Sequence, residues 1–237
     1  MFKKIRRYYF QITHPVIGEV WQLHRVTTEH SKQESMRTYE ISPSRLVTII
    51  QEYIRKGYEF ISVAEVAERM TGKQGQKFVA VTLDDGYADN YEVAYPIFQK
   101  YHVPFCIYVC EGMITCARKE DNIENYRMLS LDQIQTLDNE PLCTIGGHSR
   151  SHVRLTPLNK EQQQEEIVHC KKWLENLLNH PIEDYAFPYG DYNMMTLNIC
   201  QEIGIKRAVA SWGGSVRRNT PNKVLEIPRI LITGTTK

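Results

Sequence analysis

The chain has 237 residues and is nearly neutral, with 29 Lys and Arg against 28 Asp and Glu. This length can bury a substantial core, as one large α/β domain or two small ones. The formal charge of +1 provides no overall field that would recruit nucleic acid or an anionic membrane. No window approaches the ~18 apolar residues of a membrane span, and polar residues and Pro15 interrupt the only candidate signal-peptide segment. We therefore expect a cytoplasmic protein without nucleic-acid partners.

Cysteine usage also favours a reducing compartment. The six cysteines are scattered and lack the close paired spacing of a zinc module; they are Cys106, Cys110, Cys116, Cys143, Cys170 and Cys200. Most of them fall in apolar strand or helix patterns, so we expect free, reduced core thiols.

Strand patterns alternate with helix patterns along the chain. The first strand is expected at Glu19–Val26, where apolar and polar residues alternate. A helix then opens at Ser42 and Pro43, an N-cap and an N1 proline, and a second short helix opens at the capping box of Ser62. Further strands are expected at 77–83, 104–109, 143–147, 184–188, 207–211 and 227–232, and further helices at 91–101, 130–137, 159–178 and 194–203.

This alternation predicts a parallel sheet that helices cover, because most of the strands are continuously apolar. Seven or eight such units in one chain favour a closed barrel over an open sheet. We find no linker or repeat and expect a single catalytic domain over residues 1–237, with residues 1–18 as a candidate N-terminal extension. The polar motifs follow strand ends, where α/β folds place their sites.

The most informative segment runs from Val79 to Gly86, where a β-branched apolar run leads into Asp84 and Asp85. The run predicts a buried strand and the glycine a turn out of the sheet. Two acids at the end of a buried strand are costly to desolvate unless a cation lies beside them.

Two imidazoles further along the chain could provide partners for such a cation. His148 and His152 are separated by three residues, a spacing that lets both reach one ion if the segment turns helically. One Asp and two His would give three protein ligands with open positions for water or substrate, and the second Asp would be free to act as a base. This combination predicts metal-assisted hydrolysis.

Three motifs together resemble those of the polysaccharide deacetylases, which carry the homology domain of the nodulation deacetylase and form carbohydrate esterase family four. They are Thr82–Gly86, the His148 and His152 pair within Gly147–Leu155, and Ala186–Gly190. Their order and approximate separation match, as do Leu23–Val26 and Ile227–Ile230. The similarity covers the chain from about Val20 to its C-terminus.

The resemblance implies a distorted (β/α) barrel with about seven parallel strands. It also implies removal of N-acetyl groups from an amino-sugar-containing carbohydrate with one divalent metal ion, most often Zn, with Co, Ni, Mn or Fe as alternatives. By position, Asp84 would be the general base, and Asp85, His148 and His152 would bind the metal.

The third motif would form the acetyl pocket. Pro188, Tyr189 and Gly190 would line the acetyl group, and the backbone N–H of Tyr189 would donate to the oxyanion, which is typically worth ~3 kcal/mol. Trp212 could stack on a sugar or wall this pocket, and an ordinary core tryptophan is an equal alternative.

Two departures from the family pattern leave roles to be filled. The third motif has no arginine to orient the base, and the chain lacks the late Leu-x-His motif that supplies a general acid. We consider Arg229 and Arg25 as candidates to orient Asp84, with ordinary surface pairing as the alternative for each. His24 is the candidate acid because a barrel brings its first and last strands together; the alternative is a buried histidine with a backbone partner.

Other functions stay open at this stage. A small-molecule amidohydrolase on the same scaffold and a weakened glycan-binding relic both fit the motifs. A two-His-one-carboxylate set also occurs in non-haem iron oxygenases, but the alternating βα pattern argues against that class.

Overall fold

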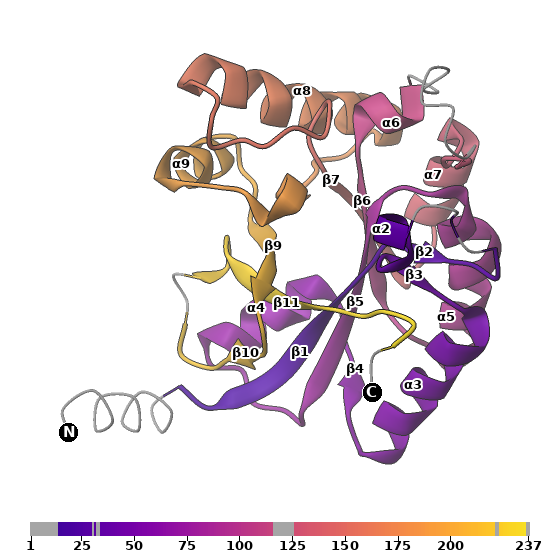
Figure 1. Ribbon diagram of the computed structural model, residues 1–237. Helices are drawn as coiled ribbons and strands as arrows, with labels where there is room; N and C mark the ends of the chain where they lie inside the picture. Colours follow the sequence, from indigo (N-terminus) through magenta and orange to yellow (C-terminus); the bar gives the residue numbers. More distant parts are fainter. Residues whose placement is uncertain (1–13, 30, 32–33, 116–125, 221–222, 236–237) are drawn as a thin grey trace.

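A closed barrel of seven parallel strands forms the centre of the molecule (Figure 1). The computed structural model describes residues 14–29, 31, 34–115, 126–220 and 223–235. The barrel strands are β1 (Val16–Leu23), β5 (Phe78–Asp85), β6 (Phe105–Val109), β7 (Cys143–Gly147), β8 (Asp184–Ala186), β9 (Arg207–Gly213) and β11 (Ile227–Leu231). The ring closes because β1 pairs in parallel with both β5 and β11. The barrel expected from the sequence is therefore confirmed.

Short strands and helices extend this ring. β4 (Glu59–Phe60) pairs with the start of β5, and β10 (Val216–Arg217) runs antiparallel to β1. β2 (Arg25–Val26) and β3 (Glu40–Ile41) form a separate parallel pair. The short helices α2 (Glu34–Arg37) and α6 (Glu111–Thr115) follow β2 and β6 in the chain.

The longer helices, except the one at Tyr95–Tyr101, begin after a residue whose side chain satisfies a backbone donor of the first turn. They are α3 (Pro43–Arg55), α4 (Val63–Thr71), α5 (Tyr95–Tyr101), α7 (Leu131–Asp138), α8 (Lys160–Leu178) and α9 (Met194–Glu202). The N-cap side chains of Ser42, Ser62, Ser130, Asn159 and Asn193 each accept a hydrogen bond from the backbone N–H three residues on. Because these caps are local signals, most of the helix starts could be predicted from the sequence.

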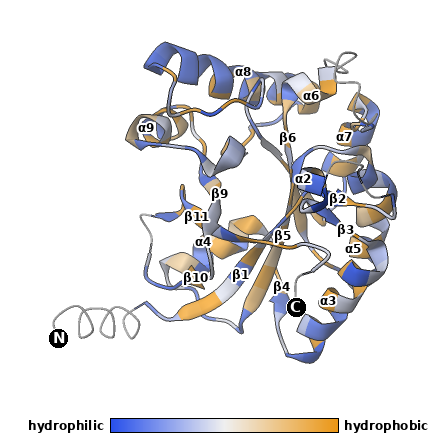
Figure 2. Cartoon of the chain, in the orientation of Figure 1, coloured by the Kyte–Doolittle hydropathy of each residue, from blue (hydrophilic) through white to orange (hydrophobic). Residues whose placement is uncertain are grey.

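The strands separate two apolar layers because their side chains alternate in direction. On β5, Val79, Val81 and Leu83 belong to the large cluster that packs under the outer helices. Phe78 and Ala80 belong instead to a second cluster, which also holds residues of α4 and of the strands opposite. Figure 2 shows the apolar strands and the hydrophilic outward side of α8. Thr82 and Asp84 continue the Phe78 and Ala80 side of the strand, toward the barrel interior.

Two expected elements differ in the structure. The first strand ends at Leu23 rather than Val26, because the N–H of Arg25 bonds the carbonyl of Tyr39 and the chain turns away toward β3. The helix expected from Tyr91 begins with a π-helical turn at Asn90–Ala94. Pro96 lies in the first turn of α5, where its missing N–H is tolerated.

Other expectations fall partly outside the described residues. Five cysteines are free in the structure, and Cys116 lies outside the described residues. Residues 1–13 of the candidate N-terminal extension are also outside them, whereas β1 begins at Val16, so residues 16–18 belong to the barrel. Within the described part of the chain, no helix combines the length and apolar character needed to cross a membrane.

Candidate active site and metal centre

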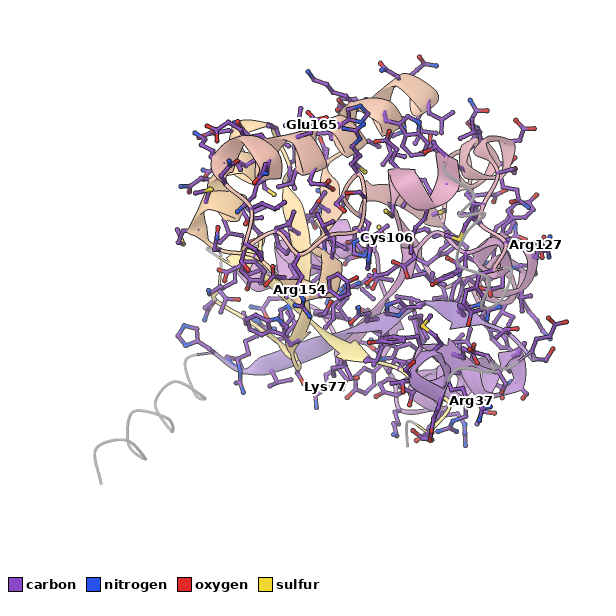
Figure 3. The ribbon with its side chains drawn as sticks, turned by 45° about the horizontal axis from the view of Figure 1, so that its top comes forward. Arg37, Lys77, Cys106, Arg127, Arg154 and Glu165 are labelled. Atoms are coloured by element: carbon purple, nitrogen blue, oxygen red, sulfur yellow. The ribbon has the colours of Figure 1, made fainter. Side chains whose placement is uncertain are left out.

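The predicted site residues meet at the end of the barrel where the parallel strands finish. Asp85 ends β5 and is level with Val109 of β6, which is in turn level with Gly147 at the end of β7. His148 follows Gly147 directly, so the strand register brings it close to Asp85. Figure 3 tilts this end of the molecule toward the viewer.

Asp85, His148 and His152 converge on one point. The Nε2 atoms of His148 and His152 lie 3.5 Å and 3.3 Å from Oδ1 of Asp85, and one ligand atom from each residue lies within 4.8 Å of the others. Oδ1 of Asp85 is buried and has no hydrogen-bond partner among the described residues. A buried carboxylate oxygen without a donor is costly, and a cation between these three atoms would satisfy it. The residues therefore fit a divalent metal.

The two imidazoles are oriented to offer Nε2 as a ligand. Nδ1 of His148 lies 2.8 Å from the carbonyl oxygen of Ala186, to which it donates, so Nε2 keeps its lone pair for a metal. Burial lowers the pKa of His148 to about 4, which keeps the ring neutral at physiological pH. Nδ1 of His152 lies 3.2 Å from the hydroxyl of Tyr189. Two imidazoles and one carboxylate are a donor set typical of catalytic zinc.

The histidine segment is a loop, so the helical turn expected from the spacing is wrong. Ser149 and His152 have φ values of 66° and 54°, and Oγ of Ser149 accepts a hydrogen bond from the N–H of His152 at 2.9 Å. The carboxylate of Glu166 on α8 accepts from the N–H of Ser151 at 2.9 Å. These bonds hold the segment in a conformation that spacing alone does not predict, with both rings directed at Asp85.

Asp84 is buried beside the metal ligands and paired with Arg229. Its two carboxylate oxygens each accept a hydrogen bond of 2.7 Å from the guanidinium, and Gln22 donates a third bond of 2.8 Å. Burial alone would raise the pKa of Asp84, but the charge and hydrogen bonds of Arg229, together with the neighbouring histidines, outweigh it and lower the pKa to about 2. Asp84 is therefore ionised over the whole physiological range.

The structure distinguishes the two arginines considered as partners of Asp84. Arg229 on β11 lies in the barrel interior and also donates to the carbonyl of Ala210 at 2.7 Å. Arg25 is engaged elsewhere, in ion pairs with Glu40 at 3.1 Å and Asp89 at 3.0 Å. Arg25 turns away because its backbone follows β2 out of the barrel, so the structure gives no support for it as the residue that orients Asp84.

His24 lies in the joint between β1 and β2, beside the carboxylates. Its charge contributes to lowering the pKa of both Asp84 and Asp85, and its ring packs on Tyr39 with centroids 4.7 Å apart. Nδ1 of His24 is buried, and no described residue forms a hydrogen bond with it. The backbone partner expected of a purely structural histidine is thus missing at this nitrogen.

The third motif forms a tight turn at the rim of the site. Pro188 and Gly190 are buried, whereas the side chain of Tyr189 is 53% exposed and its backbone has φ of 58°. Trp212 is 59% exposed and donates from Nε1 to the carbonyl of Gly190 at 3.1 Å, so it is not a core residue. A Cβ on Gly190 would meet the Trp212 ring at 2.9 Å, which explains the glycine. Arg154 stacks on Tyr189 at 4.7 Å from the ring centroid, and Figure 3 labels it at this end of the molecule.

The sequence analysis missed Gln22. Its side chain is 5% exposed and bonds Asp84 and Ser211. The available signal was a polar residue two positions before His24, but apolar and polar residues alternate in this strand, and alternation alone does not show which polar residue faces inward.

Removing metal should expose a pH dependence of stability that His148 causes. The unfolded chain takes up a proton near the ordinary pKa of 6.5, and folded His148 only near 4. The free energy of unfolding should therefore fall by about 3 kcal/mol between these pH values. Urea denaturation in EDTA from pH 7 to pH 4 measures this. His148→Gln should flatten the decline, whereas His180→Gln, which removes an exposed histidine that pairs with Asp138, should retain it; an equal decline in His148→Gln would contradict the assignment.

Known proteins resemble this chain over most of its length. A family description named polysaccharide deacetylase matches residues 71–208. YxkH of Bacillus subtilis, a polysaccharide deacetylase by name, is 28% identical over 165 residues, 69% of this chain and 56% of that protein. The poly-β-1,6-N-acetyl-D-glucosamine N-deacetylase of Staphylococcus aureus is 24% identical over 212 residues, 86% of this chain and 71% of that enzyme. The chain thus spans little more than half the length of YxkH.

Solved structures agree with this result. IcaB from Ammonifex degensii has a TM-score of 0.79 and 25% identity, covering 92% of both chains. The Streptococcus pyogenes deacetylase PplD, solved with acetate, has a TM-score of 0.79 and 24% identity, covering 93% of this chain and 94% of its own, and supports the fold. The family match covers more than half of the chain, so the protein belongs to the polysaccharide deacetylase family.

Proposed function

We propose that this protein is a metal-dependent hydrolase that removes N-acetyl groups from an amino-sugar-containing carbohydrate. The observation that carries the proposal is the convergence of Asp85, His148 and His152 beside an ionised second carboxylate, Asp84, at the mouth of the barrel. Family membership and the named activities of the relatives support the reaction class.

Asp85, His148 and His152 would hold the metal, and their mixed nitrogen and oxygen donors favour zinc. When bound, a divalent metal would polarise the amide carbonyl and lower the pKa of a nearby water. Asp84 would accept the proton of the attacking water, because Arg229 keeps its carboxylate ionised and fixed in orientation. The pairing with Arg229 supplies the orienting cation that the third motif lacks.

The rim residues would bind the acetyl group and the developing negative charge. Pro188, Tyr189 and Gly190 would line the acetyl group, with the backbone N–H of Tyr189 as the oxyanion donor. Trp212 would wall the pocket or stack on a sugar ring, which its exposure and its bond to Gly190 support.

His24 would donate the proton to the leaving amine. Its position beside Asp84 and Asp85 and the unpartnered Nδ1 support this role, and imidazole is suited to proton transfer near neutrality. His24, directly after β1, would thus serve the role that a late histidine serves in the family pattern.

The substrate class comes from the chemistry of the site and from the relatives, one of which is named for a polymer of N-acetylglucosamine. Acetate release across N-acetylated oligosaccharides and nucleotide-linked sugars, with the metal varied, would identify the substrate. Cleavage of cyclic amides instead would favour a small-molecule amidohydrolase, and binding without acetate release would favour a glycan-binding relic. The cytoplasmic location stays a prediction.

Alanine substitution of each metal ligand should remove the metal. We expect Asp85→Ala, His148→Ala and His152→Ala to lose most bound zinc, since each removes one of three ligands, and EDTA should abolish activity of the unaltered protein. Elemental analysis after dialysis measures the zinc content, with His180→Ala as the control. Full occupancy in all three variants would rule out this metal centre.

Asp84→Asn should retain the metal and lose turnover by ~10² to 10⁴, the usual contribution of general acid–base catalysis. It also leaves the Arg229 charge buried without its partner, which should lower the melting temperature. Acetate release is therefore normalised to folded, metal-loaded protein, with Asp138→Asn as a control remote in the fold. Unchanged turnover at full metal occupancy would be incompatible with Asp84 as the base.

His24→Gln should lower the turnover sharply at unchanged metal content and fold. It should also erase the decline of the rate at high pH, because a general acid must be protonated to act. The pH dependence of kcat measures this, and circular dichroism and zinc analysis serve as controls. Near-normal turnover with an intact high-pH decline would assign proton delivery to another group.

A further inference from the structure

Gln22 extends the arrangement around Asp84 beyond the residues that family resemblance suggests. It lies near the end of β1, level with Thr82 of β5 on one side and Leu231 of β11 on the other. Its side chain is 5% exposed. Nε2 donates to Oδ2 of Asp84 at 2.8 Å and to Oγ of Ser211 at 3.2 Å.

The orientation of the Gln22 amide follows from its partner. An ionised carboxylate only accepts hydrogen bonds, so the NH₂ end of the amide must face Asp84 and the oxygen end must face away. The bond is buried at both residues, and few competing water contacts can replace it. Gln22 is thus a fixed donor to Asp84.

The two carboxylate oxygens of Asp84 accept different numbers of hydrogen bonds from Arg229 and Gln22. Among the residues that the structure describes, Oδ2 accepts from Nη2 of Arg229 and from Nε2 of Gln22, whereas Oδ1 accepts only from Nη1 of Arg229. Each carboxylate oxygen offers about two lone-pair sites, so Oδ2 is filled and Oδ1 has one site left. The bidentate bond to Arg229 is symmetric and does not distinguish the two oxygens; Gln22 does.

We propose that Gln22 is a positioning residue that occupies Oδ2 of Asp84 and leaves Oδ1 as the atom that receives the proton of the attacking water. The proposal rests on the deacetylase function proposed above. In that step one O–H bond of the water breaks and its proton goes to Oδ1. The water oxygen uses the freed electron pair to bond the acetyl carbon, and the π pair of the carbonyl moves onto its oxygen.

Gln22→Met tests this proposal, since methionine has a similar length and shape but no donor. We expect kcat to fall by ~10- to 100-fold, the cost of misplacing a catalytic group, with KM and zinc content unchanged. Gln22→Glu should be at least as impaired, because it places a second acceptor beside Oδ2. The matched control is Gln163→Met. Gln163 is another buried glutamine, on α8, and it bonds Leu158 and Thr196. Its replacement should leave kcat unchanged.

Two results would overturn the role of Gln22 while leaving the deacetylase function intact: wild-type kcat in metal-loaded Gln22→Met, or a loss explained wholly by lower zinc content. If the unaltered enzyme releases no acetate from any substrate, the proposed function itself fails. The side-chain amide resonance of ¹⁵N-labelled Gln22 gives a readout besides activity. It should shift in Asp84→Asn relative to the unaltered protein, and an unmoved resonance would show that Gln22 is not held by Asp84.

Discussion

The buried pair of Asp84 and Arg229 is the interaction on which the site depends. Asp84 is the next-to-last residue of β5 and Arg229 belongs to β11, and β1 lies between these strands in the closed ring. The pair therefore exists only when the first, central and last parts of the chain have met. Two desolvated charges offset their cost only with good geometry and additional hydrogen bonds. The bidentate pairing provides the geometry, and the bonds to Gln22 and to the carbonyl of Ala210 are added to it. Closing the barrel therefore also brings Asp84 and Arg229 together.

His148 and Asp84 are both buried, but one is neutral and the other is charged because their partners differ. Burial favours the neutral form of each group. At His148 this effect prevails, and the low pKa keeps the ring available as a ligand. At Asp84 the guanidinium of Arg229 prevails, and the low pKa keeps the carboxylate charged. One buried barrel mouth thus holds a neutral imidazole and an ionised carboxylate side by side.

Much of the fold was predictable from the sequence because its signals are local. The helix caps and apolar strands located most elements, and the order βαβ predicted a closed parallel barrel. The break at His24 was not predictable, since it depends on the bond between Arg25 and Tyr39, which lies in another segment. Likewise, nothing local distinguishes Arg229 from Arg25 as the partner of Asp84. Arg229 stays on the barrel strand β11, whereas Arg25 leaves the barrel with β2. Gln22 was missed for the same reason, because its partners come from β5 and β9.

The strained backbone at the site has a physical role in this arrangement. Asp85, Ser149, His152 and Tyr189 all have positive φ, which costs free energy for residues with side chains. Contacts from other elements oppose this cost, such as the bond from Ser151 to Glu166 on α8. At Asp85 the positive φ ends the strand alternation that would direct this side chain to the opposite side from Asp84. Both carboxylates can therefore serve one site, which a regular strand would not allow.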